Sequence, residues 1–427
     1  MKGTAEVKNR KKIDRRQEGR SAKQQGLVLT EFVRQSLHDF VVFEGMKALH
    51  AMLEEDREKL CGAAYCKRID GAPVRWGKAE GRLAMGGQRV TVTKPRVRQQ
   101  GREVALPTWE AFADDDALTQ RSFDEAVIGV STRNYARSVE PLPPEVNPHG
   151  ASKSATSRRF VAKTQEYVEQ WLKRDLSQLA LAVIMIDGIV IDDDVVLIAL
   201  GIDEGGNKHP LGVWHGATEN TAAVQSLLAD LVSRGVDPLK RHLFVIDGAK
   251  ALRKAIFTVF GKSALVQRCQ EHKRRNVIEH LPEQRRKYVN SVLQQAYRMK
   301  SKELAKRRLL QLVNHLKADY PDAAASLQEG LEETLTVKSM DLLAALERTL
   351  ATTNPIENMN GTIRRVTRNV KRWRDGSMIK RWVAGALIEA QTGFRKLRGY
   401  KGMPKLVAYL RKTPSSRITL DAQEQAA

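Results

Sequence analysis

The sequence Leu181-Ala-Val-Ile-Met-Ile-Asp187 is an apolar run that ends in an aspartate. A second run of the same kind, Leu243-Phe-Val-Ile-Asp247, occurs later in the chain. Short, uninterrupted apolar runs of this kind are typical of strands that are buried on both faces of a sheet. Both runs therefore predict central strands, and each would present a carboxylate at its end.

The segments around these two runs predict the strand order. Val195–Leu200 and Leu211–Trp214 indicate two more strands, which form an antiparallel meander with the first run. A helix over 219–233, the second run, another helix ending before Gly261 and a short strand at Ala264–Val266 follow. The predicted order is three strands, a helix, a strand, a helix and a strand. This is the order of the α/β ribonuclease-H-like fold, which has a mixed five-stranded sheet.

Composition shifts divide the chain further. Helical spacing continues from Arg274 to Leu350, which predicts a large all-helical insertion in the core. We expect a basic flexible arm over 1–25 and a mainly helical N-terminal region with a small β hairpin over 26–150. These are followed by a basic helix over 151–178, the first part of the core over 179–273, the insertion over 274–350, a core helix with a basic segment over 351–412, and a tail over 413–427.

A helix-turn-helix is one interpretation of the region before the core. A helix over Ser122–Ile128 would be followed by one over Thr132–Val139, and a second candidate helix begins near Ser152. Lys153, Arg158 and Arg159 lie at the start of that second helix, where a recognition helix would contact DNA. A helical linker with a solvated basic end explains the pattern equally well.

The charge of the chain indicates a polyanionic partner. The formal net charge is +22, and residues 361–412 carry 15 Lys and Arg against 2 Asp and Glu. An inert cationic surface is the alternative, but this clustering favours double-stranded DNA. Predicted DNA contacts in this segment are Arg364, Arg365, Arg368, Lys371 and Arg372. No apolar run is long enough to span a membrane, no signal peptide is evident, and three cysteines make no disulfide framework, so we expect a cytoplasmic, nucleoid-associated protein.

Three acids are the candidate catalytic groups. Asp187 and Asp247 would emerge side by side from neighbouring strands, and Glu357 lies at the start of a helix that also carries Arg364 and Arg368. A capping box, with Asn354 as the N-cap and Glu357 at the third helical position, is the alternative explanation of the glutamate. Oxygen ligands alone favour Mg²⁺ or Mn²⁺, and two ions would suit in-line displacement at phosphorus. Acids at 192–194 also lie near the first strand, but Asp187 directly ends the apolar run.

The motifs resemble those of the Mutator-like insertion-sequence transposases of bacteria. The resemblance covers roughly Gly129 to Tyr400, and four stretches carry it: Ile186-Asp-Gly188, Gly212-Val-Trp-His-Gly-Ala-Thr-Glu-Asn220, Val245-Ile-Asp-Gly248 with Gln267-Arg-Cys-Gln-Glu-His-Lys-Arg-Arg-Asn276, and Thr353-Asn-Pro-Ile-Glu-Asn-Met-Asn360. It implies that Asp187, Asp247 and Glu357 form a DDE triad that holds the metal ions. It also implies an N-terminal region that recognises terminal inverted repeats, at least a homodimer, and DNA strand cleavage and transfer.

Cys269 and His272 belong to the same motif set. Two ligands do not complete a tetrahedral zinc site, so a site-shaping role is the expectation, with contact between His272 and DNA as a second one. Two other functions remain open: a catalytically inactive, domesticated DNA-binding regulator, and a ribonuclease-H-like nuclease that acts on RNA–DNA hybrids or branched DNA. The presence of all three acids argues against the first, and the helical insertion with the basic segment favours transposition over the second.

Overall fold

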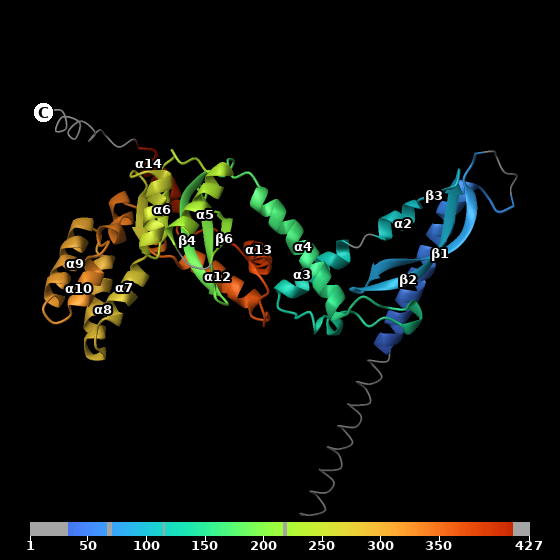
Figure 1. Cartoon of the computed structure of the whole chain (residues 1–427), viewed down its shortest axis with the longest axis horizontal. Coiled ribbons are helices and arrows are strands. Elements are labelled where there is room, and N and C mark those ends of the chain that lie inside the picture. Colours follow the sequence, from blue (N-terminus) through green and yellow to red (C-terminus); the bar gives the residue numbers. More distant parts are fainter. Residues whose placement is uncertain (1–32, 66–70, 114–115, 217–219, 413–427) are drawn as a thin grey trace, which may run out of the picture. The chain divides into compact units, whose positions relative to one another are not determined.

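The computed structural model describes residues 33–65, 71–113, 116–216 and 220–412. The basic arm expected over 1–25 and the tail expected over 413–427 lie outside these residues. The chain forms two compact units, Met1–Ala126 with Val130–Phe160 and Val127–Gly129 with Val161–Ala427. The helix α4 (Lys153–Lys173) contributes residues to both units. Figure 1 labels many of the elements of both units.

The first unit packs a long helix against a small sheet. Residues 33–61 are helical, and the sheet contains β1 (Val74–Met85), β2 (Gln88–Gln99) and β3 (Arg102–Val104) in antiparallel order. Leu49 and Leu53 of the helix share a core with Val90 and Val92 of β2. The helices α2 (Pro107–Phe112) and α3 (Asp116–Val127) and the short 3₁₀ turns η1 (Tyr135–Arg137) and η2 (Pro144–Val146) complete this unit.

Strand β1 was not predicted from the sequence. Its residues lack apolar alternation, and Leu83 is its only fully buried side chain. Gly81 interrupts the pattern for a packing reason, because a Cβ atom there would lie 2.2 Å from Cη2 of Trp109. The indole ring therefore packs directly on the backbone of β1, which a sequence pattern does not reveal.

The helix expected over Thr132–Val139 is absent, and the turn η1 stands in its place. Tyr135 explains the difference, because its side chain is buried and its hydroxyl donates a hydrogen bond of 3.0 Å to the carbonyl of Gly87. That tertiary contact favours a turn over a surface helix. The first of the two helix-turn-helix arrangements considered is therefore wrong, whereas the basic helix expected from Ser152 onward is confirmed as α4.

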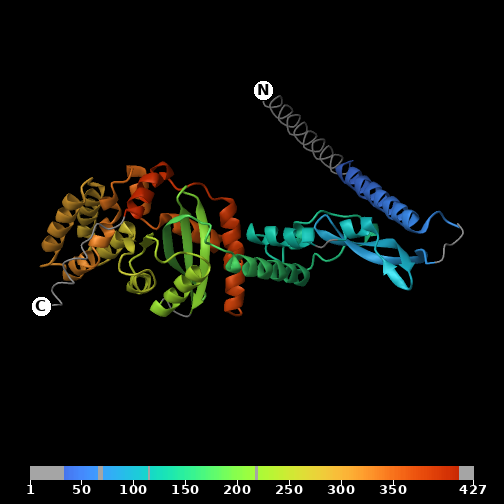
Figure 2. The same cartoon turned by 90° about the horizontal axis from the view of Figure 1, so that it is seen from above.

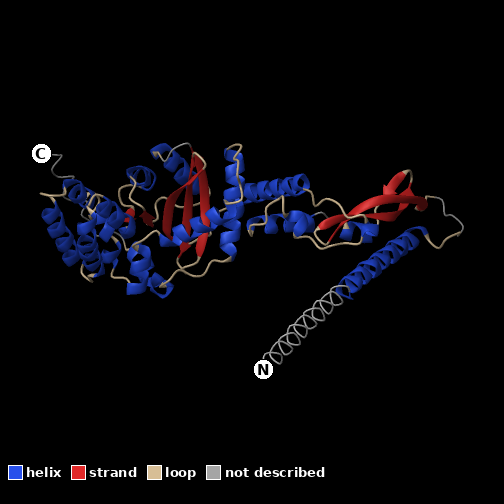
Figure 3. Cartoon of the chain, turned by 90° about the horizontal axis from the view of Figure 1, so that it is seen from below, coloured by secondary structure: helices blue, strands red, loops and turns tan. Residues whose placement is uncertain are grey.

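The second unit contains the mixed five-stranded sheet that the sequence predicts (Figure 3). Its order is β6 (Lys208–Gly216), β5 (Asp194–Asp203), β4 (Leu181–Ile191), β7 (Leu243–Ile246) and β8 (Leu265–Arg268). The first three strands are antiparallel neighbours, and β7 and β8 run parallel to β4. The crossover helices are α5 (Thr221–Ser233), which Asn220 caps through Ala223 N at 2.9 Å, and α6 (Lys250–Phe260).

The two faces of this sheet are covered by different helices. Ile184 and Ile186 of β4 lie in one core with α5 and α6. Val183 and Met185 are fully buried but lie outside that core, so they face the other side, where α12 (Asn354–Thr367) and α14 (Met403–Arg411) pack on β4. The helix α13 (Gly376–Thr392) packs on β6, and the turn η5 (Tyr400–Gly402) leads into α14.

The segment between β8 and α12 is helical, as expected, and has a core of its own. It appears in yellow to orange beside the sheet in Figures 1 and 2. The elements are α7 (Gln270–Glu279), α8 (Glu283–Arg298), α9 (Lys302–Leu316), α10 (Pro321–Gln328), the turns η3 (Glu332–Leu335) and η4 (Val337–Met340), and α11 (Ala344–Leu350). Among the described residues, none of the helices has the length and apolar character needed to cross a membrane.

Candidate active site

Asp187 and Asp247 occupy equivalent positions on neighbouring parallel strands. The register pairs Met185 with Val245, so each aspartate lies two residues beyond the last pair. Side chains alternate along a strand, and Ile184, Ile186, Phe244 and Ile246 all belong to the core with α5 and α6. Both aspartates therefore project to the opposite face, where α12 packs.

The strand does not end at Asp187 as the sequence suggested. β4 continues to Ile191, and Asp187 pairs with Ile198 of β5. The neighbouring β5 extends the antiparallel ladder past the last pair with β7, which keeps Asp187 inside regular structure. Of the acids at 192–194, Asp192, with a φ of 58°, and Asp193 form the following turn. Asp194 begins β5 and is ion-paired with His215 at 2.9 Å. These three acids are separate from the pair formed by Asp187 and Asp247.

Glu357 lies on the first turns of α12, but not in a capping box. The N-cap is Thr353, so Asn354 is already helical and Glu357 is the fourth helical residue. The expected N-cap at Asn354 is wrong by one position. The side chain of Thr353 makes no capping hydrogen bond, and the backbone amide of Glu357 donates instead to the carbonyl of Thr353 at 3.0 Å. Capping therefore does not explain the glutamate.

Asn360 connects α12 to the first aspartate. Its Nδ2 donates a hydrogen bond of 2.7 Å to Oδ2 of Asp187, and its side chain is buried. One helical turn separates it from Glu357, so the bond holds the glutamate's helix against the aspartate's strand. Its Oδ1 is buried and has no hydrogen-bond partner among the residues that the structure describes. An orphaned acceptor beside a carboxylate is costly unless a cation or a donor approaches it.

Asp187 has a perturbed acidity. Burial, followed by the charge of Asp247, raises the pKa of Asp187 to about 6, and Glu357 acts in the same direction while His272 opposes it. The carboxylates of Asp247 and Glu357 are thus close enough to Asp187 to disfavour its charged form. Oδ1 of Asp247 accepts a hydrogen bond of 2.9 Å from the backbone amide of Ala249, which fixes the orientation of this carboxylate.

Asp187→Asn is expected to stabilise the metal-free protein above pH 6. Because the folded-state pKa is raised from 3.8 to about 6, the stability that this group contributes is present below the lower value and is lost as the pH rises through the higher one. The asparagine variant avoids a loss of at most ~3 kcal/mol. Thermal melts in EDTA should show a higher Tm for the variant than for the wild type near pH 8, and little difference in Tm near pH 4. The same difference in Tm at both pH values would contradict the raised pKa of Asp187.

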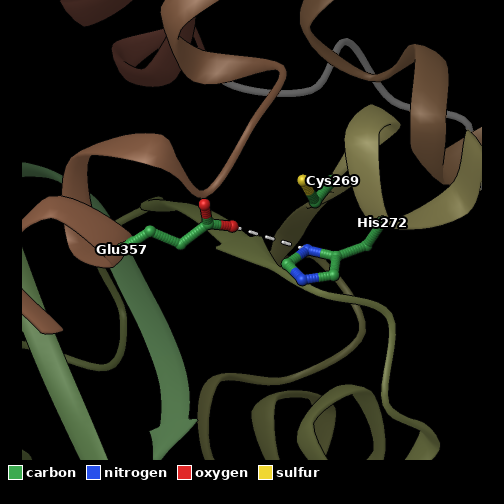
Figure 4. Close-up of side chains that lie close together, drawn as sticks. All are labelled: Cys269, His272 and Glu357. Carbon is green, nitrogen blue, oxygen red and sulfur yellow. Dashed lines mark ion pairs between the residues drawn. The ribbon is translucent and has the colours of Figure 1, made fainter. Parts of the chain in front are cut away.

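Cys269 and His272 face Glu357 from the start of α7 (Figure 4). Nδ1 of His272 lies 3.8 Å from Oε1 of Glu357, and the ligand atoms of all three residues lie within 4.8 Å of one another. The hydrogen bond with Cys269 raises the pKa of His272 to about 9, and the charges of Glu357 and Asp247 add to this effect against burial. Burial opposes ionisation of the Cys269 thiol, but hydrogen bonds with His272 and Thr353 outweigh it and lower its pKa.

Arg268 fixes the turn that follows Asp247. Its buried guanidinium donates to the carbonyl of Gly248 and, at 3.0 Å, to the carbonyl of Glu329 in the helical segment. Gly248 has a φ of 113°, and a Cβ atom there would lie 2.8 Å from Nε of Arg268. The glycine after Asp247 therefore permits close approach of the arginine. Arg268, Thr353 and Asn360 are functional candidates that the sequence analysis did not single out, although all three lie inside the quoted motifs.

The predicted DNA contacts differ in their surroundings. Lys153 and Arg158 are exposed on α4, and five cations at and beyond the end of α12 are exposed as well: Arg364, Arg365, Arg368, Lys371 and Arg372. Arg159 is buried, with Nε donating to Ser122 Oγ at 2.9 Å and Nη2 donating to the carbonyl of Gly150 at 2.8 Å. His272 is half-buried beside Glu357. The guanidinium of Arg159 is thus committed to the interior of the first unit.

Comparison with known proteins identifies the family. The model of the family described as "Transposase, Mutator family" matches residues 21–396. The chain belongs to the Mutator family of transposases. Two relatives are similar over most of this transposase. The transposase for insertion sequence element ISRM5 of Rhizobium meliloti (strain 1021) is 29% identical over 75% of this chain and 79% of its own length. The transposase for insertion sequence element IS1081 of Mycobacterium tuberculosis (strain ATCC 25618 / H37Rv) is 25% identical over 83% of this chain and 85% of its own length.

A third relative matches a shorter part of the transposase. It is a probable transposase for an insertion sequence element of Corynebacterium diphtheriae, 30% identical over 48% of this chain and 60% of its own length. The family match spans β4, β7 and α12, the three elements that carry Asp187, Asp247 and Glu357. DNA is accordingly the partner that the family implies.

Proposed function

We propose that the chain recognises the terminal inverted repeats of an insertion sequence and catalyses divalent-metal-dependent cleavage and transfer of DNA strands, with Asp187, Asp247 and Glu357 as the catalytic acids. The observation that supports this most is the bond between Asn360 and Asp187, which holds α12 against β4. It brings an acid from a distant part of the sequence to the face that the two strand aspartates share. The raised pKa of Asp187 agrees with that convergence.

The residues of the site fit a divalent ion. Three carboxylates provide hard oxygen ligands, and their mutual repulsion would be relieved by positive charge. The orphaned Oδ1 of Asn360 is a further oxygen at the same place. We propose two Mg²⁺ or Mn²⁺ ions as the cofactor, held by Asp187, Asp247 and Glu357. Such ions would supply Lewis acidity at the scissile phosphate, while the chain's own part is to hold the ligands and align the strand.

We also propose that the core is ribonuclease-H-like. The sheet order with an antiparallel meander and two parallel strands supports the assignment, as does the helix carrying Glu357 on one face. The helical segment 274–350 would be the insertion, and 26–150 with the basic helix 151–178 would serve DNA recognition and dimerisation. A homodimer would hold two element ends at once, and light scattering with and without end DNA measures that state.

The surface around α12 supports a path for DNA. Arg364 and Arg368 follow Glu357 along the same stripe of the helix, and Lys371 and Arg372 continue beyond its end. A hollow of about 340 Å³ flanks the helix, and its lining includes Lys208, Arg395 and Arg365, the last of which is ion-paired with Glu389 at 3.3 Å. Burial lowers the pKa of Lys208. A phosphate bound there would stabilise the charged form of the lysine and would itself be held by that charge. Lys153 and Arg158 on α4 are the proposed contacts from the N-terminal region.

The direct test is a cleavage assay on the DNA that flanks the gene. Purified protein, Mg²⁺ and an end-labelled duplex containing the element end should give cuts at the end of the inverted repeat that leave a 3′ hydroxyl. The same duplex with a scrambled repeat should stay intact. Binding to the end without cleavage in Mg²⁺ or Mn²⁺ would identify a DNA-binding regulator instead, and cleavage of RNA–DNA hybrids or branched DNA in preference to the element end would identify a nuclease.

A further inference from the structure

The hydroxyl of Thr353 lies at the centre of the contacts between the helical segment and Glu357. Its Oγ1 is 2.7 Å from Oε1 of Glu357, 3.3 Å from Nδ1 of His272 and 3.3 Å from Sγ of Cys269. The side chain is fully buried. A threonine at an N-cap normally accepts a hydrogen bond from its own helix, but this one makes no such bond. The hydroxyl is therefore turned away from capping and toward the glutamate.

The protons of this cluster can be assigned. A hydroxyl has one proton to donate, and its shortest contact is with the carboxylate of Glu357, so that bond receives the proton. A lone pair of Oγ1 then faces His272, and Nδ1 donates to it whenever that nitrogen carries a proton. Sγ of Cys269 accepts from the backbone amide of Thr353 at 3.4 Å, which fixes the residue that carries the hydroxyl. Oγ1 thus bridges Glu357 and His272, and Sγ of Cys269 lies 3.3 Å from the same oxygen.

We propose that Thr353 is a positioning residue, held by Cys269 and His272, that orients the carboxylate of Glu357 for binding the divalent ion. This inference rests on the proposed function. The bond from Thr353 restrains Oε1 and leaves the other carboxylate oxygen available to the ion. Removing a hydrogen bond to a carboxylate that binds a metal lowers metal affinity or activity by roughly 10- to 100-fold. Cys269 and His272 thus act on Glu357 indirectly, because they hold Thr353 in place.

A soft metal bound by Cys269, His272 and Glu357 is the competing explanation, because their ligand atoms lie within 4.8 Å of one another. Oγ1 of Thr353 is within 3.3 Å of all three atoms and so takes up the space between them. The cluster is therefore a hydrogen-bonded one. Zinc binding by the full chain, lost in Cys269→Ser and retained in Thr353→Val, would overturn the proposal.

The test compares Thr353→Val, which keeps the shape of the side chain but removes the hydroxyl, with Thr353→Ser, which keeps the hydroxyl. Binding of Mn²⁺ to the full chain with end DNA is followed by electron paramagnetic resonance, and strand cleavage by the end-labelled duplex. We expect Thr353→Val to raise the half-saturating Mn²⁺ concentration roughly 10-fold or more, and Thr353→Ser to stay within about 3-fold of wild type. Thr352→Val is the matched control, because the hydroxyl of Thr352 bonds to the carbonyl of Thr349 at 3.4 Å and not to Glu357, His272 or Cys269.

The outcomes separate this inference from the proposed function. Wild-type Mn²⁺ affinity in Thr353→Val overturns it, and so does an equal loss in the valine and serine variants accompanied by a lower Tm, because packing alone would explain that result. Glu357→Gln is measured beside them. If it weakens Mn²⁺ binding and Thr353→Val does not, only the role of Thr353 falls; if Glu357→Gln leaves binding unchanged, both conclusions fall.

Discussion

Alanine at Asp187, Asp247 or Glu357 is expected to reduce strand cleavage by on the order of 10³-fold or more, while end binding stays within a few-fold of wild type. Loss of one ligand removes several kcal/mol of charge stabilisation at the scissile phosphate, and each ~1.4 kcal/mol corresponds to a tenfold change in rate. The measurements are single-turnover cleavage of end-labelled duplex and a mobility shift on the same duplex.

Asp193→Ala is the matched control for these variants. Asp193 is an exposed acid in the turn after β4, close in sequence to Asp187 but outside the group formed with Asp247 and Glu357. It should cleave at the wild-type rate. Wild-type cleavage by any one of the three alanine variants would remove that acid from the mechanism, and a parallel loss of end binding would indicate a folding defect.

DNA affinity should fall steeply with salt, by roughly 10³-fold between about 50 and 200 mM if six or more phosphates are contacted. The exposed cations Arg364 and Arg368 lie on the stripe of α12 that begins with Glu357, so each contact that they make releases condensed counterions. Replacing Arg364 and Arg368 together with glutamine should lower the slope of log affinity against log salt by about 2. Titrations monitored by fluorescence anisotropy at four salt concentrations measure the slope.

Lys405→Met provides the comparison for that experiment. It also removes one positive charge, but Nζ of Lys405 is already paired with Asp341 at 2.5 Å. Its slope should match that of the wild type. A slope that is unchanged in the double arginine variant would exclude this face of α12 from the DNA surface.

The central strands were predictable because both of their faces are buried. β7 coincides with its apolar run, and β4 begins where its run begins. The continuation of β4 past Asp187 was not predicted, because Asp187-Gly188 resembles the start of a turn until β5 is known to pair with the residues after it. The exposed strand β1 was missed for the related reason that its neighbours, including Trp109, supply the packing.

The candidate residues also divide into those that the local sequence predicts and those that depend on distant contacts. Asp187, Asp247 and Glu357 could be selected by their places on elements, and Arg364 and Arg368 by their helical spacing. Arg159 could not be separated from them, because its buried partner Ser122 is 37 residues away in sequence. The hydroxyl of Thr353 and the amide of Asn360 depend on contacts across 84 and 173 residues, which neither spacing nor propensity reports.

The helical segment leaves the sheet at Cys269 and returns at Thr353, and these two residues are in hydrogen-bonding contact. Cys269 is also bonded through its amide to the carbonyl of Ile246, at the end of the strand before Asp247. The two ends of the helical segment are thus held together by Cys269 and Thr353. A change in length near α8 and α9 would leave the carboxylates undisturbed, whereas a substitution at Cys269 or Thr353 would loosen both ends of the segment together.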